Sequence, residues 1–567
     1  GACGSRANPQ HSVTVEPANN TFGTGQPIHF PIIPEKPYVD DYYALYIRNG
    51  SNFWNQYHQR DATMMRVMRK TNVNSQAYQP ANVFINGKYF GVYELREKAN
   101  EGYFNENYGN HLDSLDLLSV SYFYGMVLRT VKGSDSSFFN MINFISTYDK
   151  TDPNYLRYCD RKLDFKNYTD YLIGETWYAN TDWIYNNMKM ARTQSTDNKW
   201  RFFLQDLEWG LGGWTDYNAN MFDWFQYAHQ PNLYYTIYSH LIQDSTFRNY
   251  YINRYADLMN TTLHQNTYTP IVQHMYQELL PEMPRHFSFW TGDVAGGMNT
   301  YTYNRDVIIG QFNNRNNAVR NQMLSHFGLQ NTVDVTLKTI PDEAGYIKIS
   351  TIIPDSLPWT GVYFNGNPVR ISAHANPGFT FDHWEYNINL PASLLNDSSV
   401  VVNIASSYYF HAVFTGTPKD TTLTISEIHY NPDSTVDGGN WIELHNHGNH
   451  PIDLTGYVVR SSDQYEKYAF RDFTTIPANG YLVLAQDSIR FSNEYPSVPN
   501  VIGGTGFGWE NNGDSIYVID PHQRSVIAMH YSNQWDKLRC ADGFGRTMEN
   551  KNPQGYALDS NQWFCGS

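Results

Sequence analysis

The hydrophobic pattern of this chain changes at residue 331, and this change most limits the folds open to it. Before it, apolar residues recur at helical spacing in long segments and also form short runs typical of strands. After it, short β-branched and aromatic runs alternate with Gly, Pro and Asn, without a helical period. A chain of 567 residues is also too long for one hydrophobic core. We therefore expect a multidomain protein, α+β first and all-β afterwards.

A polar linker, TGTPKDTT at residues 415–422, separates two all-β stretches. We expect an α+β domain over residues 1–331, a small all-β module over 332–416 and a β-sandwich over 417–567. Trp384 of the middle module is expected in its core, not on a ligand-binding surface.

Within the first domain, local signals predict a helix at 55–71, a helix at 164–183, a buried strand at 200–209 and helices through 231–327. The segment VFINGKYFGVYEL has apolar runs on both sides of Asn86-Gly87, a dipeptide that supplies the positive φ angles of a tight turn. A β-hairpin is therefore predicted there.

Charge and cysteine content narrow the class of protein. The formal charge is −15 and no Lys/Arg run occurs, which argues against a nucleic-acid or anionic-membrane partner. No apolar stretch reaches the roughly 20 residues of a membrane span. Of four Cys, Cys540 and Cys565 are candidates for a disulfide, which would suit an exported protein, and Cys3 and Cys159 are expected to be buried thiols. The first residues have neither a Met start nor a signal-peptide core, so we expect a truncated or processed N-terminus.

One stretch carries candidate chemistry for phosphoryl transfer. Asp182 and Asn187 have four residues between them, the spacing of a kinase catalytic loop, in which the Asp accepts the hydroxyl proton and the Asn holds metal. Asp206 follows an apolar strand, where a kinase places its metal-binding Asp. The alternative is chance, because the chain is rich in Asp and Asn. No zinc motif, P-loop or G-x-S-x-G elbow competes with this interpretation.

Three segments in order, INGKYFGVYELREKANEGYF, DFKNYTDYLIGETWYANTDWIYNNMKMAR and KWRFFLQDLEWGLGG, resemble successive motifs of the CotH family, the spore-coat-protein-H-like atypical kinases. The resemblance covers about the first 330 residues. It implies a kinase-like fold, ATP with Mg²⁺ or Mn²⁺ as cofactors, and phosphorylation of Ser on protein partners. It also implies roles for five residues: Asp182 as the catalytic Asp, Asn187 as a metal or phosphate ligand, Asp206 and Glu208 as metal ligands, and Glu97 in the hairpin motif.

Two positions depart from the family pattern. Glu208 stands where the family often has Asp, and its extra methylene moves the oxygens that would bind Mg²⁺. His11, mostly neutral at pH 7, stands where a basic residue is expected. Binding of the nucleotide phosphates would then depend on Arg6, Lys98 or Arg96.

The remaining modules also resemble known domains. Residues 332–414 look like the small β repeats of bacterial surface proteins, and 417–567 resemble the lamin-tail domain, an immunoglobulin-like sandwich, which implies attachment or protein recognition. A candidate Ca²⁺ set near its start is better explained by tight turns; its members are Asp433, Asp437, Asn440 and Glu443.

Three functions follow from these observations. The first is an exported bacterial kinase, secreted or on the cell surface, that phosphorylates a protein Ser or Thr. The second is a catalytically inactive CotH-like scaffold or adhesion protein. The third is a surface glycan-binding protein, suggested by the 16% aromatic content.

Overall fold

The computed structural model describes residues 8–566 with short gaps. The gaps are residues 18–22, 24, 31, 34, 37–38, 40, 70, 109–114, 123–125, 194–197, 229–231, 355, 377, 388–393, 417–421, 433–437, 463–465, 506, 522–524, 534, 536–537, 539–540, 544 and 553–559. The chain divides into two compact units, residues 1–35 with 40–332, and residues 36–39 with 333–567.

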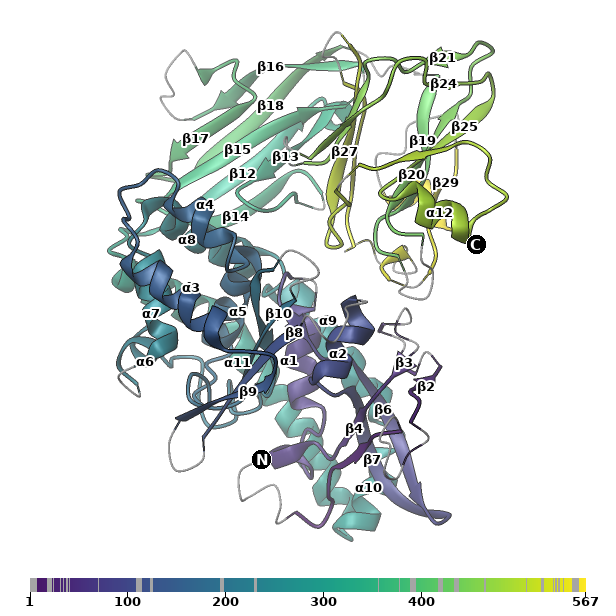
Figure 1. The fold of residues 1–567 in the computed structure, drawn as a ribbon. Coiled ribbons are helices and arrows are strands. Elements are labelled where there is room, and N and C mark those ends of the chain that lie inside the picture. The colour runs from purple at the N-terminus through teal and green to yellow at the C-terminus, as the bar shows by residue number, and fades with distance from the viewer. Residues whose placement is uncertain are drawn as a thin grey trace. The chain divides into compact units, whose positions relative to one another are not determined.

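The first unit mixes β-sheets with many helices (Figure 1). Its strands are β1 Val13–Val15, β2 Ile28–His29, β3 Asp41–Tyr42, β4 Leu45–Arg48, β5 Asn74–Ser75, β6 Tyr78–Ile85, β7 Lys88–Glu97, β8 Leu115–Tyr122, β9 Met126–Lys132, β10 Met188–Thr193 and β11 Trp200–Leu204. Its helices are α1 Arg60–Met68, α2 Glu101–Tyr108, α3 Ser136–Thr147, α4 Tyr155–Asp160, α5 Phe165–Trp177, α6 Met221–Tyr227, α7 Leu233–Leu241, α8 Ser245–Asn260, α9 Gln265–Leu279, α10 Met283–Trp290 and α11 Val294–Phe327. One sheet has the order β1-β4-β7-β6, another has the order β5-β11-β10-β8-β9, and β2 and β3 form a small two-stranded sheet.

The predicted hairpin is confirmed. Strands β6 and β7 pair antiparallel, and Asn86 and Gly87 take φ angles of 50° and 77° at the turn. The β6–β7 hairpin runs beside α10 (Figure 1), where the Trp290 indole donates to the Phe90 carbonyl at 3.1 Å. Gly91 is required at this contact, because a Cβ there would lie 2.5 Å from the Trp290 indole nitrogen.

Two helices are shorter in the structure than the sequence predicts. The segment before Arg60 makes i→i+3 turns, such as Arg60 N to Tyr57 O at 3.1 Å, so α1 begins five residues later than predicted. Helix α5 starts at its cap Asp164, as predicted, but ends at Trp177 because Ala179 takes a φ of 53°. Strand β11 likewise ends at Leu204, just before Asp206, which has a φ of 57°.

The second unit is all-β apart from short helices such as α12 (Ser488–Glu494). The strands of the middle module are β12 Thr332–Ile340, β13 Gly345–Ile349, β14 Trp359–Phe364, β15 Pro368–Ala375, β16 Phe379–Tyr386, β17 Ser399–Asn403 and β18 Tyr408–Gly416. They form sheets β14-β12-β18-β16 and β13-β15-β17. Trp384 is 1% exposed and donates to the Asp397 carbonyl at 2.9 Å, which confirms its place in the core.

The last module is an immunoglobulin-like sandwich, as predicted. Its strands are β19 Leu423–His429, β20 Trp441–Asn446, β21 Ile452–Asp453, β22 Val458–Arg460, β23 Lys467–Ala469, β24 Thr475–Ile476, β25 Gly480–Ala485, β26 Val501–Gly503, β27 Asp514–Ile519, β28 Ser525–Tyr531, β29 Met548–Asn550 and β30 Trp563–Cys565. Sheets β26-β25-β20-β19-β29-β30 and β23-β22-β27-β28 share one apolar core, to which Ile442 and Val518 contribute from opposite sheets.

The cysteines follow the prediction where they can be compared. Cys159 is a buried free thiol, and Cys565 is disulfide-bonded. Cys3 and Cys540 lie outside the described residues, as do Asp433 and Asp437 of the candidate Ca²⁺ set. Across the described chain, no helix has both the length and the apolar character that a membrane span requires.

Candidate active site

The loop after α5 places Asp182, and its backbone is unusual. Ala179, Ile184 and Asn187 all have left-handed φ angles, of 53°, 76° and 54°. Such angles are tolerated by Asn but cost energy in Ala179, and most of all in the β-branched Ile184. Asn180 holds the loop, because its amide donates to Glu175 Oε2 at 2.9 Å while its Oδ1 accepts from the Asp182 N–H at 3.3 Å.

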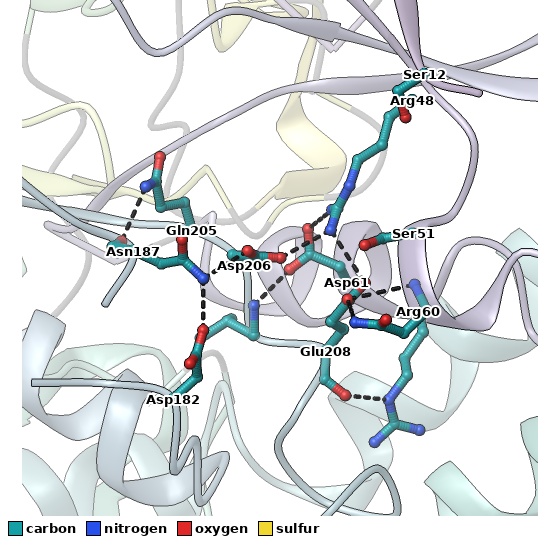
Figure 2. A network of polar contacts seen from close by, with 12 residues as sticks. Ser12, Arg48, Ser51, Arg60, Asp61, Asp182, Asn187, Gln205, Asp206 and Glu208 are labelled. Atoms are coloured by element: carbon teal, nitrogen blue, oxygen red, sulfur yellow. Dashed lines mark hydrogen bonds and ion pairs between the residues drawn. The ribbon is translucent and has the colours of Figure 1, made fainter. Parts of the chain in front are cut away.

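The three residues singled out by spacing come together in space. The Asn187 amide nitrogen donates to Asp182 Oδ2 at 2.6 Å and to Asp206 Oδ2 at 2.7 Å (Figure 2). Gln205 donates to the Asn187 carbonyl at 2.8 Å, which ties the loop to the end of β11. The Asp206 side chain is 33% exposed to solvent, whereas Asp182 is buried.

Arg48 joins this trio to a second group of carboxylates. From the end of β4, its guanidinium contacts Asp61 of α1, Asp206 Oδ1 at 2.7 Å and Glu208 Oε2 at 3.0 Å (Figure 2). Asp61 also accepts from Arg96 at 2.5 Å and from the Leu207 N–H at 2.6 Å. The contacts of Arg48 and Asp61 therefore hold β4, α1, β7 and the segment after β11 together.

Glu208 lies in the network with both oxygens engaged. Oε2 accepts from Arg48, and Oε1 accepts from the Asn52 amide at 2.6 Å. Its main-chain carbonyl accepts from Arg60 at 3.0 Å. The site thus contains Glu208, but turned toward Arg48 and Asn52.

The pKa values reflect a buried site with more carboxylates than cations. Burial, then the charge of Asp206, raises the pKa of Asp182 to about 6. Burial raises the pKa of Glu208 to about 7 against the opposing effect of Arg48. Burial would also raise the pKa of Asp61, but Arg48 and Arg96 outweigh it and lower that pKa to about 2. Partial protonation of the carboxylates therefore neutralises some of the negative charge that the arginines leave uncompensated.

Of the other candidates from the sequence, Arg96 belongs to this network through Asp61, whereas Glu97 and Lys98 have other partners. Glu97 is buried, where Oε2 accepts from the Ala77 N–H at 2.8 Å and Oε1 from Asn107 at 2.7 Å. Lys98 forms an ion pair with Glu16. The His11 side chain is exposed, and Arg6 lies outside the described residues. Arg96 is fully buried between Asp61 and Glu94.

Sequence reasoning missed Arg48 and Asp61, although a signal existed for both. Arg48 ends the apolar run LYIR, and Asp61 lies in a helix buried on almost every side. Charged residues are rare inside such segments unless they are paired, so each indicates a buried partner.

Glu175 makes the site sensitive to pH. Burial, with Asp182 and Asp206 adding to it, raises the pKa of Glu175 from 4.5 to about 8. A raised folded-state pKa stabilises the fold below the unfolded pKa, and this contribution is lost as pH rises through the folded pKa. Glu175→Gln mimics the neutral acid. We expect its free energy of unfolding, relative to that of the native protein, to rise by about 3 kcal/mol as the pH increases from 5 to 8. Thermal unfolding of both proteins over this range measures the difference; a difference independent of pH would contradict it.

Family models match two parts of the chain. The sequence model of the CotH kinase protein family matches residues 51–319, and that of the lamin tail domain matches residues 417–533. No curated protein matches the chain. A solved DUF4876 family protein from Bacteroides thetaiotaomicron is 13% identical to this chain. The match covers 28% of this chain and 49% of that protein, with a TM-score of 0.10. This chain thus spans about half of that protein.

A solved DUF3823 family protein from Parabacteroides merdae is 10% identical to this chain. The match covers 35% of this chain and 95% of that protein, with a TM-score of 0.13. Neither likeness carries an argument about the fold. The family matches agree with the architecture: residues 51–319 belong to the CotH kinase protein family, and residues 417–533 form a lamin tail domain.

Proposed function

We propose that the CotH domain transfers the terminal phosphoryl group of ATP to a hydroxyl, on a protein Ser or Thr, with Mg²⁺ or Mn²⁺. The observation that carries the proposal is the Asn187 amide, which bonds to Asp182 and Asp206 at 2.6 and 2.7 Å. These are the three residue types that a kinase uses for its base and its metal.

Asp182 is the candidate base. A carboxylate whose pKa is raised to about 6 is ionised at pH 7 yet basic enough to accept a proton from a hydroxyl. Its Oδ2 accepts from Asn186 at 2.8 Å as well as from Asn187, so two amides orient it.

Asp206 and Asn187 would hold the metal ion. Among the described residues, no group of three His, Cys, Asp or Glu side chains could hold a metal by itself. Mg²⁺ in phosphoryl-transfer sites commonly takes one or two carboxylates and completes its shell with water and substrate phosphates, so the half-open Asp206 fits this use. The excess of carboxylates over arginines also favours a cation. Such a metal would supply charge neutralisation at the phosphates.

A second candidate function is an inactive scaffold. It is favoured by Glu208, whose two side-chain oxygens already accept from Arg48 and Asn52. Loss of the biological function in Asp182→Ala with the fold intact would argue against a scaffold.

We also propose an exported protein, secreted or on a bacterial cell surface, whose lamin tail domain binds a protein partner or attachment site. The disulfide at Cys565 supports export, because disulfides persist outside the reducing cytosol.

Thermal unfolding with ATP and each metal tests the kinase proposal. A ligand that binds only the native state raises the apparent stability, by about 2.7 kcal/mol at one hundred times its Kd. We expect ATP with Mg²⁺ or Mn²⁺ to raise the Tm of the native protein, and Asp206→Asn to remove the metal-dependent part. Absence of any shift, together with absence of phosphate transfer to casein, would refute the proposal.

A further inference from the structure

One face of the last module is buried although it lies outside the sandwich core. In sheet β23-β22-β27-β28, Ile516 and Val518 of β27 point into that core. Their neighbours Ser515 and Tyr517 point to the opposite face, because side chains alternate along a strand. Such an outer face is commonly solvated, yet Ser515 is 1% exposed and Tyr517 is 4% exposed. Another part of the chain therefore covers this face.

The middle module covers it. The hydroxyl of Tyr346, on β13, forms a hydrogen bond with the hydroxyl of Tyr517, which in turn lies 2.8 Å from Nδ1 of His374, on β15. The rings of Tyr346 and His374 stack with their centroids 4.8 Å apart. The guanidinium of Arg460, on β22, lies over the Tyr517 ring at 3.9 Å. Both modules belong to one compact unit, in which β13 and β27 are neighbours (Figure 1).

A second histidine, His530 of β28, completes the contact. Its Nδ1 donates to the Asp514 carbonyl at 2.8 Å, since a carbonyl can only accept. Its ring centroid lies 5.9 Å from that of Tyr346. The two modules thus each contribute a histidine to the same tyrosine. We call this contact the inter-module joint; its members are Tyr346, His374, Arg460, Tyr517 and His530.

The charges that face the two histidines are positive. Lys348 of β13 faces both rings, and Arg460 also faces His374. Burial, followed by these cations, lowers the pKa of His374 to about 3. Burial also lowers the pKa of His530 to about 4, with Lys348 adding to it and the hydrogen bond to Asp514 opposing it. Within the described residues no carboxylate acts on either ring, so both histidines are neutral at pH 7.

We propose that the inter-module joint is a pH-sensitive latch, which is closed while His374 and His530 are neutral and opens when they take up protons. An imidazolium in the closed joint would be buried beside other cations, without a carboxylate to pair with. Once the joint opens, water solvates the ring, and a solvated histidine has a pKa near 6.5. Protons therefore bind the open form more tightly, and falling pH shifts the population toward it.

The pH range of the latch follows from the two forms. Because the pKa of each histidine is lower in the closed joint, closure is most favoured above about pH 6.5 and weakens as the pH falls below it. Each histidine that opening exposes should raise the ratio of open to closed forms by about 25-fold between pH 7 and pH 5. The latch does not depend on the proposed kinase reaction.

Thiol labelling of Ser515→Cys in the full chain tests the latch, because the joint covers this position beside Tyr346. The labelling rate with dithiodipyridine at each pH is divided by the rate for glutathione, and mass spectrometry distinguishes the new thiol from Cys159. We expect the relative rate to rise at least tenfold from pH 7 to pH 5. Ile516→Cys, the adjacent position in the sandwich core, is the control for unfolding of the module and should change less than about threefold.

Histidine substitutions separate the latch from other effects of acid. The pair His374→Asn and His530→Asn keeps a polar group near each Nδ1 but cannot take up a proton in this pH range. Together they should reduce the rise in Ser515→Cys labelling to within about threefold. His450→Asn, which replaces an exposed histidine, is the matched control and should keep the full rise.

Three results would overturn the latch. The first is equal relative labelling of Ser515→Cys at pH 7 and pH 5. The second is a parallel rise in Ile516→Cys, which would mean that the module unfolds. The third is a rise that the paired Asn substitutions leave unchanged. If Ser515→Cys does not fold, hydrogen exchange at the imidazole C2 of the native chain reports both titrations: midpoints below about pH 6 support the latch, and midpoints near 6.5 refute it.

Discussion

Replacing Asp182 with Asn is expected to lower phosphoryl transfer by about 10³-fold, because the amide cannot accept the hydroxyl proton. The fold should survive, since the remaining side-chain oxygen can still accept from Asn186 and Asn187. Burial already disfavours the charge of Asp182, so the Tm should stay the same or rise slightly.

Single-turnover transfer of labelled phosphate from ATP, alongside nucleotide affinity and Tm, separates chemistry from binding. Asp223→Asn, an exposed Asp of α6, is the matched control and should leave all three values native. A transfer rate in Asp182→Asn within about threefold of native would remove Asp182 from the role of base. Absence of transfer in the native protein despite nucleotide binding would favour the scaffold.

Replacing Arg48 with Met is expected to destabilise the first unit by about 3–5 kcal/mol at pH 7, the usual effect of removing one partner from a buried ion pair. The Arg48 side chain is 8% exposed and contacts Asp61, Asp206 and Glu208. Asp61 keeps Arg96, but Asp206 and Glu208 lose their only arginine among these contacts. The deficit should shrink as pH falls, because the orphaned carboxylates then take up protons.

Urea or thermal unfolding at pH 7 and pH 5 measures this effect. Adding Glu208→Gln to Arg48→Met should recover part of the loss, because it removes one unpaired buried charge. Arg201→Met, which breaks a half-buried pair with Asp164 at 2.9 Å, is the control and should cost about 1 kcal/mol or less. If Arg48→Met costs no more than this control, the network does not hold the site together.

The sequence features that predicted the structure correctly were local ones. The turn at Asn86-Gly87 needs positive φ angles that few dipeptides supply, so the hairpin could be predicted. The loss of helical period after residue 331 belongs to the same class. The spacing of Asp182, Asn187 and Asp206 also pointed to one site, because the loop and the strand end that carry them are close in the chain.

Tertiary structure alone decided the rest of the site. Arg48 and Asp61 are more than a hundred residues from Asp206 and Glu208, and only the packing of β4 and α1 against the segment after β11 brings them together. The partners of Glu97 and Glu208 were likewise not visible in the sequence, because a carboxylate binds whichever donors the fold places beside it. Local sequence thus determined which elements form and where the candidate base lies. Long-range packing determined which charges meet, since ion pairing depends on distance in space and not on separation along the chain.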